Sequence, residues 1–113
     1  MNLKRVVVTG IGSLTPIGNN TVEYWRSLVS GKSGAGPITH FNPENFKTNF
    51  ACELKNINLQ EHFERKELRK YDNYTAYGLI AVNEAIKDSK LNLEDIDKSL
   101  AGVIWGSGIG GIK

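Results

Sequence analysis

The sequence predicts an α/β chain, and two strand-like runs and one long amphipathic helix are the observations that predict it. Arg5–Thr9 and Ala101–Trp105 are short apolar runs, and each leads directly into glycine. Their apolar residues are continuous, which is typical of strands that are covered on both faces of a sheet. Residues 65–89 carry apolar side chains at three- and four-residue steps, the spacing of one face of a helix.

The first predicted strand is followed by a loop and then by a helix. Residues 10–18 are rich in glycine and contain a proline, so they form the loop. We expect the helix to run from about residue 20 to residue 30. Asn20 is a suitable N-cap, with Glu23 three residues later, close to a capping box. Gly31 can close the helix at its other end.

The middle of the chain alternates between loop and helix. Residues 31–48 predict a long surface loop, and Phe50, Cys52 and Leu54 alternate with other residues as a weak strand would. Residues 92–99 are polar and predict turns or a short helix. The apolar stripe of the long helix consists of Leu68, Tyr71, Thr75, Leu79, Val82 and Ile86. About three strands are few for a doubly covered sheet, so we expect a piece of a larger protein.

Composition excludes several classes of protein. The chain has 113 residues, a net charge of +2, 40% hydrophobic residues and 23% charged residues, which excludes a disordered or collagen-like chain. No apolar run is long enough to span a membrane or to serve as a signal peptide, so we expect a soluble, cytoplasmic chain with no membrane partner. A single cysteine predicts neither an intrachain disulfide nor a metal cage.

The positive charge is concentrated at the start of the long predicted helix. Residues 65–70, RKELRK, carry a local charge of +3, so the remaining chain carries −1. Lys66, Arg69 and Lys70 stand at helical positions i, i+3 and i+4, which places them on one face. Two interpretations remain open at this point: a solvated helix start, or a surface that docks an acidic partner. Nucleic acid is not expected, because the remainder is slightly acidic and no aromatic platform accompanies the patch.

The glycines at the end of the chain allow a nucleotide-binding hypothesis. Gly106, Gly108 and Gly111 match the pattern G-x-G-x-x-G after a strand-like run, which is the fingerprint of dinucleotide sites. The helix and the acidic residue that complete this fingerprint are not present within the 113 residues. The motif therefore stands as a weak alternative, and we expect no cofactor.

No catalytic constellation is visible among the cysteine and the histidines. Cys52 alternates with Phe50 and Leu54, so we expect a small buried thiol rather than a nucleophile. His40 and His62 have no metal-ligand spacing to other candidate ligands. We expect both histidines to be surface or capping groups and no metal site to be present.

Taken together, seven landmarks resemble one enzyme family in order and spacing over essentially the whole chain. In chain order they are RVVVTGIG (5–12), TPIGN (15–19), Trp25, GKSG (31–34) with ITHF (38–41), and RKELRKYD (65–72) with GSGIGG (106–111). This arrangement resembles the opening of the β-ketoacyl-acyl-carrier-protein synthases, the condensing enzymes of fatty-acid elongation, and most closely the synthase II type.

The resemblance implies a fold and a reaction. It implies the thiolase-like fold, with residues 1–113 forming the N-terminal segment of its first α/β half and the rest of the enzyme absent. The parent protein is then a homodimer and an acyltransferase that joins an acyl thioester to malonyl-acyl carrier protein by decarboxylative Claisen condensation. The family's catalytic cysteine and histidines lie downstream of the GSGIGG loop, so these residues include no catalytic group and we expect them to be inactive alone.

The resemblance also implies two groups of site residues. Lys66, Arg69 and Lys70 match basic positions that meet acyl carrier protein, and Gly108 and Ile109 match positions that line the acyl pocket. This reading makes the glycine loop a close-packed part of that pocket, without a dinucleotide. Two alternatives remain: a non-catalytic module that binds acyl carrier protein, and a fragment of a nucleotide-binding oxidoreductase.

Overall fold

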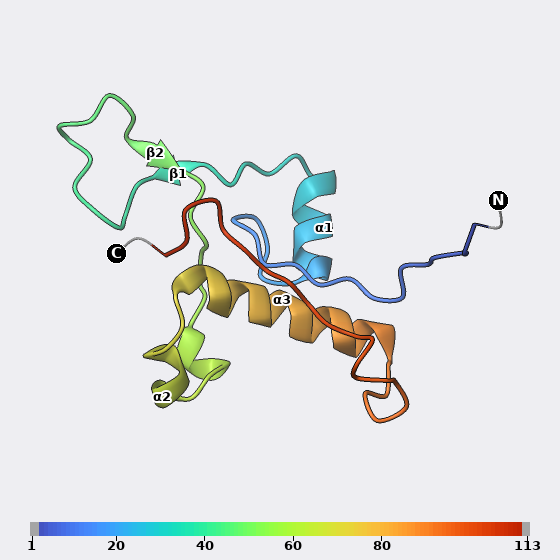
Figure 1. Ribbon diagram of the computed structural model, residues 1–113. Helices are drawn as coiled ribbons and strands as arrows, with labels where there is room; N and C mark the ends of the chain where they lie inside the picture. The colour runs from blue at the N-terminus through green and yellow to red at the C-terminus, as the bar shows by residue number, and fades with distance from the viewer. Residues whose placement is uncertain (1–2, 112–113) are drawn as a thin grey trace.

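Helix α3 is the axis of the molecule, and the other elements lie around it in the computed structural model (Figure 1). The structure describes residues 3–111. The elements in chain order are α1 (Thr21–Val29), β1 (Gly36–Pro37), β2 (Phe50–Ala51), the 3-10 helix η1 (Leu59–Glu61), α2 (Arg65–Leu68) and α3 (Asn73–Ser89). After α3 the chain turns back, and its last described segment runs along α3 towards the start of that helix (Figure 1).

The predicted helix at residues 20–30 is confirmed as α1, which is shorter by one residue at each end. The side chain of Asn20 accepts a hydrogen bond from the backbone N–H of Glu23 at 2.9 Å, so Asn20 is the N-cap. At the other end Gly31 has φ +66° and donates its N–H to the carbonyl of Leu28 at 3.0 Å. Local capping signals therefore fix both ends of this helix.

The prediction of one continuous helix over residues 65–89 is wrong. Helix α2 ends at Leu68, and α3 begins only at Asn73. Asp72 has extended backbone angles, φ −71° and ψ 156°, and forms the N-cap of α3. The dipeptide Asp72–Asn73 marks the break, because aspartate and asparagine are poor residues for a helix interior and are favoured at helix starts; the Asp72 side chain makes no cap hydrogen bond. The predicted apolar stripe is half-buried, whereas the fully buried residues of α3 are Ala76, Gly78 and Ile80.

The two predicted buried strands do not form within the part of the chain that the structure describes. Arg5–Thr9 and Ala101–Trp105 have no strand assignment, and Val6 and Ile104 are 88% and 102% exposed. A strand needs a neighbour to accept and donate its ladder hydrogen bonds, and residues 3–111 provide none at either run. The apolar side chains of these two runs therefore remain exposed to solvent in the structure.

The weak strand at residues 50–54 is confirmed only in its first two residues. Strand β2 pairs with β1 in an antiparallel two-stranded sheet, in which Gly36 faces Ala51. The loop predicted at residues 31–48 therefore includes a short strand and forms an arm that extends away from α3 (Figure 1). Cys52 lies beyond the sheet and is exposed, so the expectation of a buried thiol is wrong.

The glycines near the N-terminus pack directly against the backbone of α3. A Cβ atom at Gly12 would lie 2.7 Å from the backbone nitrogen of Ala85, and one at Gly10 would lie 2.6 Å from that of Ser89. Any larger residue at these two positions would push the loop off the helix. The helix presents small side chains here, so loop and helix approach each other backbone to backbone.

Two carboxylates on α3, which we call the carboxylate clamp, hold the same loop. Glu84 accepts hydrogen bonds from the backbone N–H groups of Thr21 and Ser13, at 2.8 and 2.9 Å. Asp88, one helical turn later, accepts from the N–H of Ile11 at 2.9 Å. Because Thr21 begins α1, the clamp fixes both the loop and the start of that helix relative to α3.

The structure is open for its size. Its accessible surface is 9756 Å², compared with about 6,200 Å² for a folded monomer of this mass. Its radius of gyration is 17.4 Å, compared with about 13 Å for a compact domain of this length. Large apolar side chains contribute to the excess, because those of the uncovered strand-like runs and of α1 are exposed.

Among the described residues, no helix combines the length and the apolar character that crossing a membrane requires.

Candidate docking surface and glycine loop

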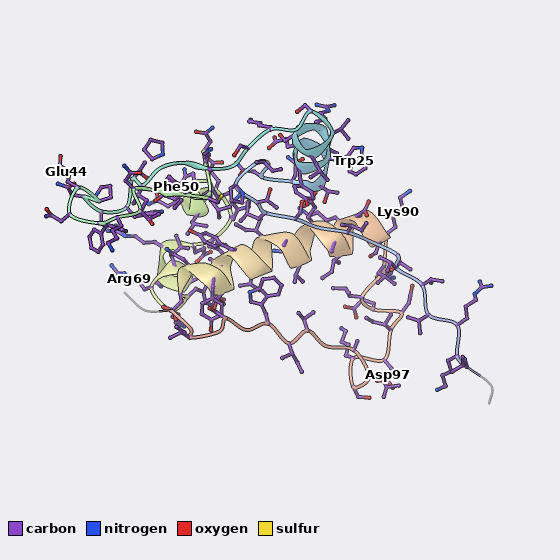
Figure 2. The ribbon with its side chains drawn as sticks, turned by 90° about the horizontal axis from the view of Figure 1, so that it is seen from above. Trp25, Glu44, Phe50, Arg69, Lys90 and Asp97 are labelled. Atoms are coloured by element: carbon purple, nitrogen blue, oxygen red, sulfur yellow. The ribbon has the colours of Figure 1, made fainter. Side chains whose placement is uncertain are left out.

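The sequence-predicted cationic residues surround the short helix α2, and we call Arg65, Lys66, Arg69 and Lys70 the basic cluster. All four are exposed. Arg69 is the C-cap of α2 with helical backbone angles, φ −73° and ψ −18°, and the N–H of Lys70 donates to the carbonyl of Glu67 at 2.8 Å. The helical spacing therefore continues through Lys70, and Arg69 lies at the α2 end of the molecule, far from Lys90 at the other end of α3 (Figure 2).

No acidic side chain neutralises the basic cluster within residues 3–111. Glu67, the one acidic residue inside the segment, bends back so that its carboxylate accepts the N–H of Glu64 at 3.0 Å in a capping box. Within the described chain, the basic and acidic side chains that approach each other within 4 Å are Lys98 with Glu94 and His40 with Glu53. The four cations are thus available to an anionic partner.

An aromatic contact supports the turn that carries the cluster. The rings of Phe63 and Tyr71 pack edge to face with centroids 5.8 Å apart. The N–H of Phe63 donates to the carbonyl of Leu59 in η1 at 3.1 Å. The basic cluster lies between these two aromatic residues in the chain, so their contact closes the turn and holds α2 against η1.

The glycine loop, residues 106–111, is open along most of its length. A Cβ atom at Gly108 would meet no atom within 4 Å, and Ile109 is 82% exposed. Gly110 has φ +86°, a left-handed conformation that glycine adopts without strain. The expectation of a close-packed loop holds only at its end, where Gly111 lies against the side chain of Asp72.

That contact brings the two groups of predicted site residues to the same end of α3. Asp72 is the N-cap of α3 and follows Lys70 by two residues. The glycine loop therefore ends next to the segment that carries the basic cluster. Sequence separation gave no indication of this proximity, because the chain must first run the length of α3 and return.

The histidines occupy the peripheral positions expected from the sequence. His62 is the exposed C-cap residue of η1, and the His40 side chain is 72% exposed. Among the described residues, no group of three or more histidine, cysteine, aspartate or glutamate side chains could hold a metal ion.

Glu53 is a polar anchor that the sequence analysis did not identify. Its carboxylate accepts a hydrogen bond from the Thr39 hydroxyl at 2.7 Å and another from the Thr39 N–H at 3.1 Å. These bonds stabilise the ionised form and lower the pKa of Glu53 below its usual value of 4.5, with the hydroxyl contributing most. Glu53 ties the strand-like segment after β2 to the segment after β1.

Comparison with known proteins decides the family of the chain. The profile of a family described as "Beta-ketoacyl synthase, N-terminal domain" matches residues 3–113. The chain belongs to the β-ketoacyl synthase family. The predicted thiolase-like α/β fold is confirmed. Residues 3–111 contain one two-stranded sheet, β1–β2.

Curated relatives in this family are similar over almost the whole chain. The 3-oxoacyl-[acyl-carrier-protein] synthase 2 of Staphylococcus aureus (strain N315) is 42% identical over 110 residues, which cover 97% of this chain and 27% of that protein. The synthase 2 of Synechocystis sp. (strain ATCC 27184 / PCC 6803 / Kazusa) is 40% identical over 110 residues, 97% of this chain and 26% of that protein. The chain thus spans about a quarter of the length of these relatives.

Solved structures of ketosynthases have a similar fold. The ishigamide ketosynthase/chain length factor aligns with a TM-score of 0.71 and 33% identity, over 80% of this chain and 22% of that one. A second structure, AntDE:AntF, is described as a type II PKS acyl-carrier protein in complex with its ketosynthase bound to the hexaketide. It shares the fold, with a TM-score of 0.61 and 23% identity over 80% of this chain and 23% of that one.

Proposed function

We propose that these residues form the N-terminal segment of a 3-oxoacyl-[acyl-carrier-protein] synthase that elongates fatty acids. The observation that carries the proposal is the 42% identity to a synthase 2 over 97% of the chain. In the reaction, an acyl group is held as a thioester on an enzyme cysteine. Malonyl-acyl carrier protein loses carbon dioxide, its carbanion forms a carbon–carbon bond to the acyl carbonyl, and the cysteine thiolate leaves.

The catalytic cysteine and the histidines of this reaction belong, in this proposal, to the part of the parent enzyme beyond residue 113. Cys52 is not proposed as the nucleophile, because it is exposed next to β2 and no helix begins there to stabilise a thiolate. The 113 residues contribute binding surfaces and no acid, base or nucleophile. We expect no condensation by the chain alone.

The basic cluster is proposed as the surface that receives acyl carrier protein, through Lys66, Arg69 and Lys70. Three features support this role: the residues are exposed, they are unpaired within the described chain, and they hold a local +3 against a remainder of −1. Clustered positive charge of this kind attracts an acidic protein and accelerates encounter. The contact of an acyl carrier protein with its ketosynthase in a protein of the same fold is consistent with this partner.

The test of docking is a titration of the chain with acyl carrier protein, followed by calorimetry or by NMR. Changing Lys66, Arg69 and Lys70 to glutamate should weaken binding by about tenfold or more, because three attractive contacts become repulsive. The matched control changes three exposed lysines outside the cluster, Lys4, Lys47 and Lys87, to glutamate.

Both triple variants take the net charge from +2 to −4, so they differ only in where the charge lies. Equal weakening by the two variants would mean that only total charge matters, and the docking assignment would fail. Binding that ignores both variants and also ignores raised salt would show that no electrostatic surface is used.

Gly108 and Ile109 are proposed to line the acyl pocket of the parent enzyme. Gly108 has free space around it and Ile109 is exposed, so neither is committed to packing within the described chain. In a synthase-length chain, Gly108→Val should reduce the use of long acyl primers more than that of short ones. Mass spectrometry of the 3-oxoacyl products measures the ratio. An unchanged profile would remove Gly108 from the pocket.

The activity itself is tested with the same synthase-length chain, supplied with acyl- and malonyl-acyl carrier protein. Formation of 3-oxoacyl product and carbon dioxide in equal amounts supports the proposal. Decarboxylation or binding without condensation would favour the non-catalytic alternative. The homodimer and the cytoplasmic location expected from the sequence remain predictions.

A further inference from the structure

The C-terminal segment is fastened to α3 through a tryptophan that lies on a glycine. The indole Nε1–H of Trp105 donates a hydrogen bond to the carbonyl of Tyr74 at 3.2 Å. A Cβ atom at Gly78 would lie 2.6 Å from Nε1 and 2.8 Å from Cδ1 of the same indole. Any side chain at position 78 would therefore collide with the ring. Trp105 reaches the helix only because residue 78 has no side chain.

Gly78 occupies a position where a helix disfavours glycine. It is the sixth residue of the 17-residue helix α3, and it is buried. Glycine is the poorest helix former apart from proline, so alanine would suit the helix itself better. Glycine at position 78 lowers the helix propensity of α3, but it lets the indole of Trp105 pack closely against the helix.

A second contact lies at the other end of the glycine loop, where Gly111 meets Asp72. The two contacts are six residues apart on both partners, from position 72 to 78 on the helix and from 105 to 111 on the segment. Six residues span about 9 Å along a helix but up to about 20 Å in an extended chain. The segment can therefore be longer than the distance it bridges, which gives residues 106–110 the length to bow away from the helix.

The structure agrees with such an arch over residues 106–110. Cβ atoms at Gly106 and Gly108 would meet nothing within 4 Å, Gly110 has φ +86°, and Ile109 is 82% exposed. Within residues 3–111, the indole provides the one hydrogen bond that joins residues 101–111 to the rest of the chain. At its Trp105 end, the arch is therefore held by a single hydrogen bond and by the packing of the indole ring on Gly78.

We propose that the contact of Trp105 with Gly78 is a positioning contact that sets where the arch, and with it Ile109, stands on α3. Releasing the indole frees one end of the arch, while the end at Asp72 stays in place. The inference concerns the placement of the loop, and it stands whether or not the loop lines an acyl pocket.

The test uses the 113-residue chain with Trp25→Phe, which leaves Trp105 as the sole tryptophan. Gly78→Ala should shift the indole N–H resonance of Trp105 and the backbone amide resonances of residues 106–110 together. Because Trp105 is now 58% exposed, full release raises its accessibility to a fluorescence quencher by about 1.7-fold at most. Gly102→Ala is the control on the same segment, since a Cβ there would meet nothing within 4 Å, and it should leave the indole unchanged.

Combining Gly78→Ala with Trp105→Leu separates the effect of alanine on α3 itself from the loss of the contact with the indole. With Trp105→Leu, Gly78→Ala should protect the amides of α3 from exchange by about fivefold more, because only the helix propensity of alanine remains. With Trp105 present, the same change should give less protection or none. Equal effects of Gly78→Ala in the two backgrounds would overturn the proposal, as would an indole resonance that does not move.

Trp105→Phe keeps the sequence of α3 intact and removes the N–H donor, so it tests the contact without any risk to the helix. The amides of residues 106–110 should shift in this variant while the hydrogen-exchange protection of α3 stays within about twofold of the parent. Unshifted loop amides would show that the indole does not position the arch.

Discussion

Removing the Glu84 carboxylate should loosen two elements at once, the loop at Ser13 and the start of α1 at Thr21. The carboxylate accepts the N–H groups of Ser13 and Thr21 at 2.9 and 2.8 Å, and Glu84 is half-buried. A hydrogen bond to a charged group contributes about 1.5–3 kcal/mol, and partial exposure lets water replace some of that. We expect Glu84→Ala to lower the free energy of unfolding by about 2–3 kcal/mol.

Glu84→Gln separates the charge and the second acceptor from the shape of the side chain. The amide keeps one oxygen that accepts, but its NH₂ group cannot accept from a backbone N–H. About half of the loss, roughly 1–1.5 kcal/mol, should therefore appear in this variant. Urea titration measures the total, and amide hydrogen exchange assigns it, because the protection of Ser13 and Thr21 should fall more than that of the middle of α3.

Asn83→Ala is the matched control, since Asn83 is the exposed neighbour of Glu84 on the same helix. Its effect should stay within about 0.5 kcal/mol. If Ser13 and Thr21 exchange at the same rate in the parent chain and in Glu84→Gln, the carboxylate clamp does not hold the loop.

Three further changes test the local chemistry of the chain. Lys90→Gly should raise the free energy of unfolding by about 1 kcal/mol in urea, because Lys90 ends α3 at φ +55°, where a side chain is strained. Asn20→Ala should lower it by about 1 kcal/mol, since the N-cap bond of α1 is lost; unchanged helix content by circular dichroism would contradict this. The pKa of Glu53 is lowered in the folded chain, so its contribution to folding stability is present above pH 4.5 and is lost as the pH falls through the lowered pKa. Thr39→Val should move the titration midpoint of Glu53, measured by carbon-detected NMR, upward. An unmoved midpoint would exclude Thr39 as the cause.

The elements that local chemistry fixes could be predicted from the sequence. Asn20 and Gly31 mark the ends of α1 within one residue, because a cap acts on the backbone immediately beside it. The break before α3 also had a local signal in Asp72 and Asn73, which the continuing apolar stripe obscured. The exposure of the basic cluster followed from its charge, since four cations in six residues are costly to bury.

The features that depend on distant partners could not be predicted in this way. The strand-like pattern of Arg5–Thr9 describes a strand only where another strand lies beside it, and residues 3–111 supply none. Glu84 looks like any exposed helical glutamate until the loop folds back over 71 residues of sequence to meet it. The contact of Trp105 with Gly78 could not be predicted either, because the local sequence around each residue gives no sign of the other.

The open architecture has a consequence for how cooperatively this chain unfolds. An unfolded chain of this mass exposes about 18,100 Å², so subtracting the 9756 Å² of the folded chain leaves about 8,300 Å² to be exposed on unfolding. A compact domain of equal mass would expose about 11,900 Å². Since both the denaturant m-value and the heat-capacity change scale with newly exposed surface, each should be about 70% of the ordinary value. The unfolding transition should therefore be broad, and its breadth measures how much surface this folded chain leaves uncovered.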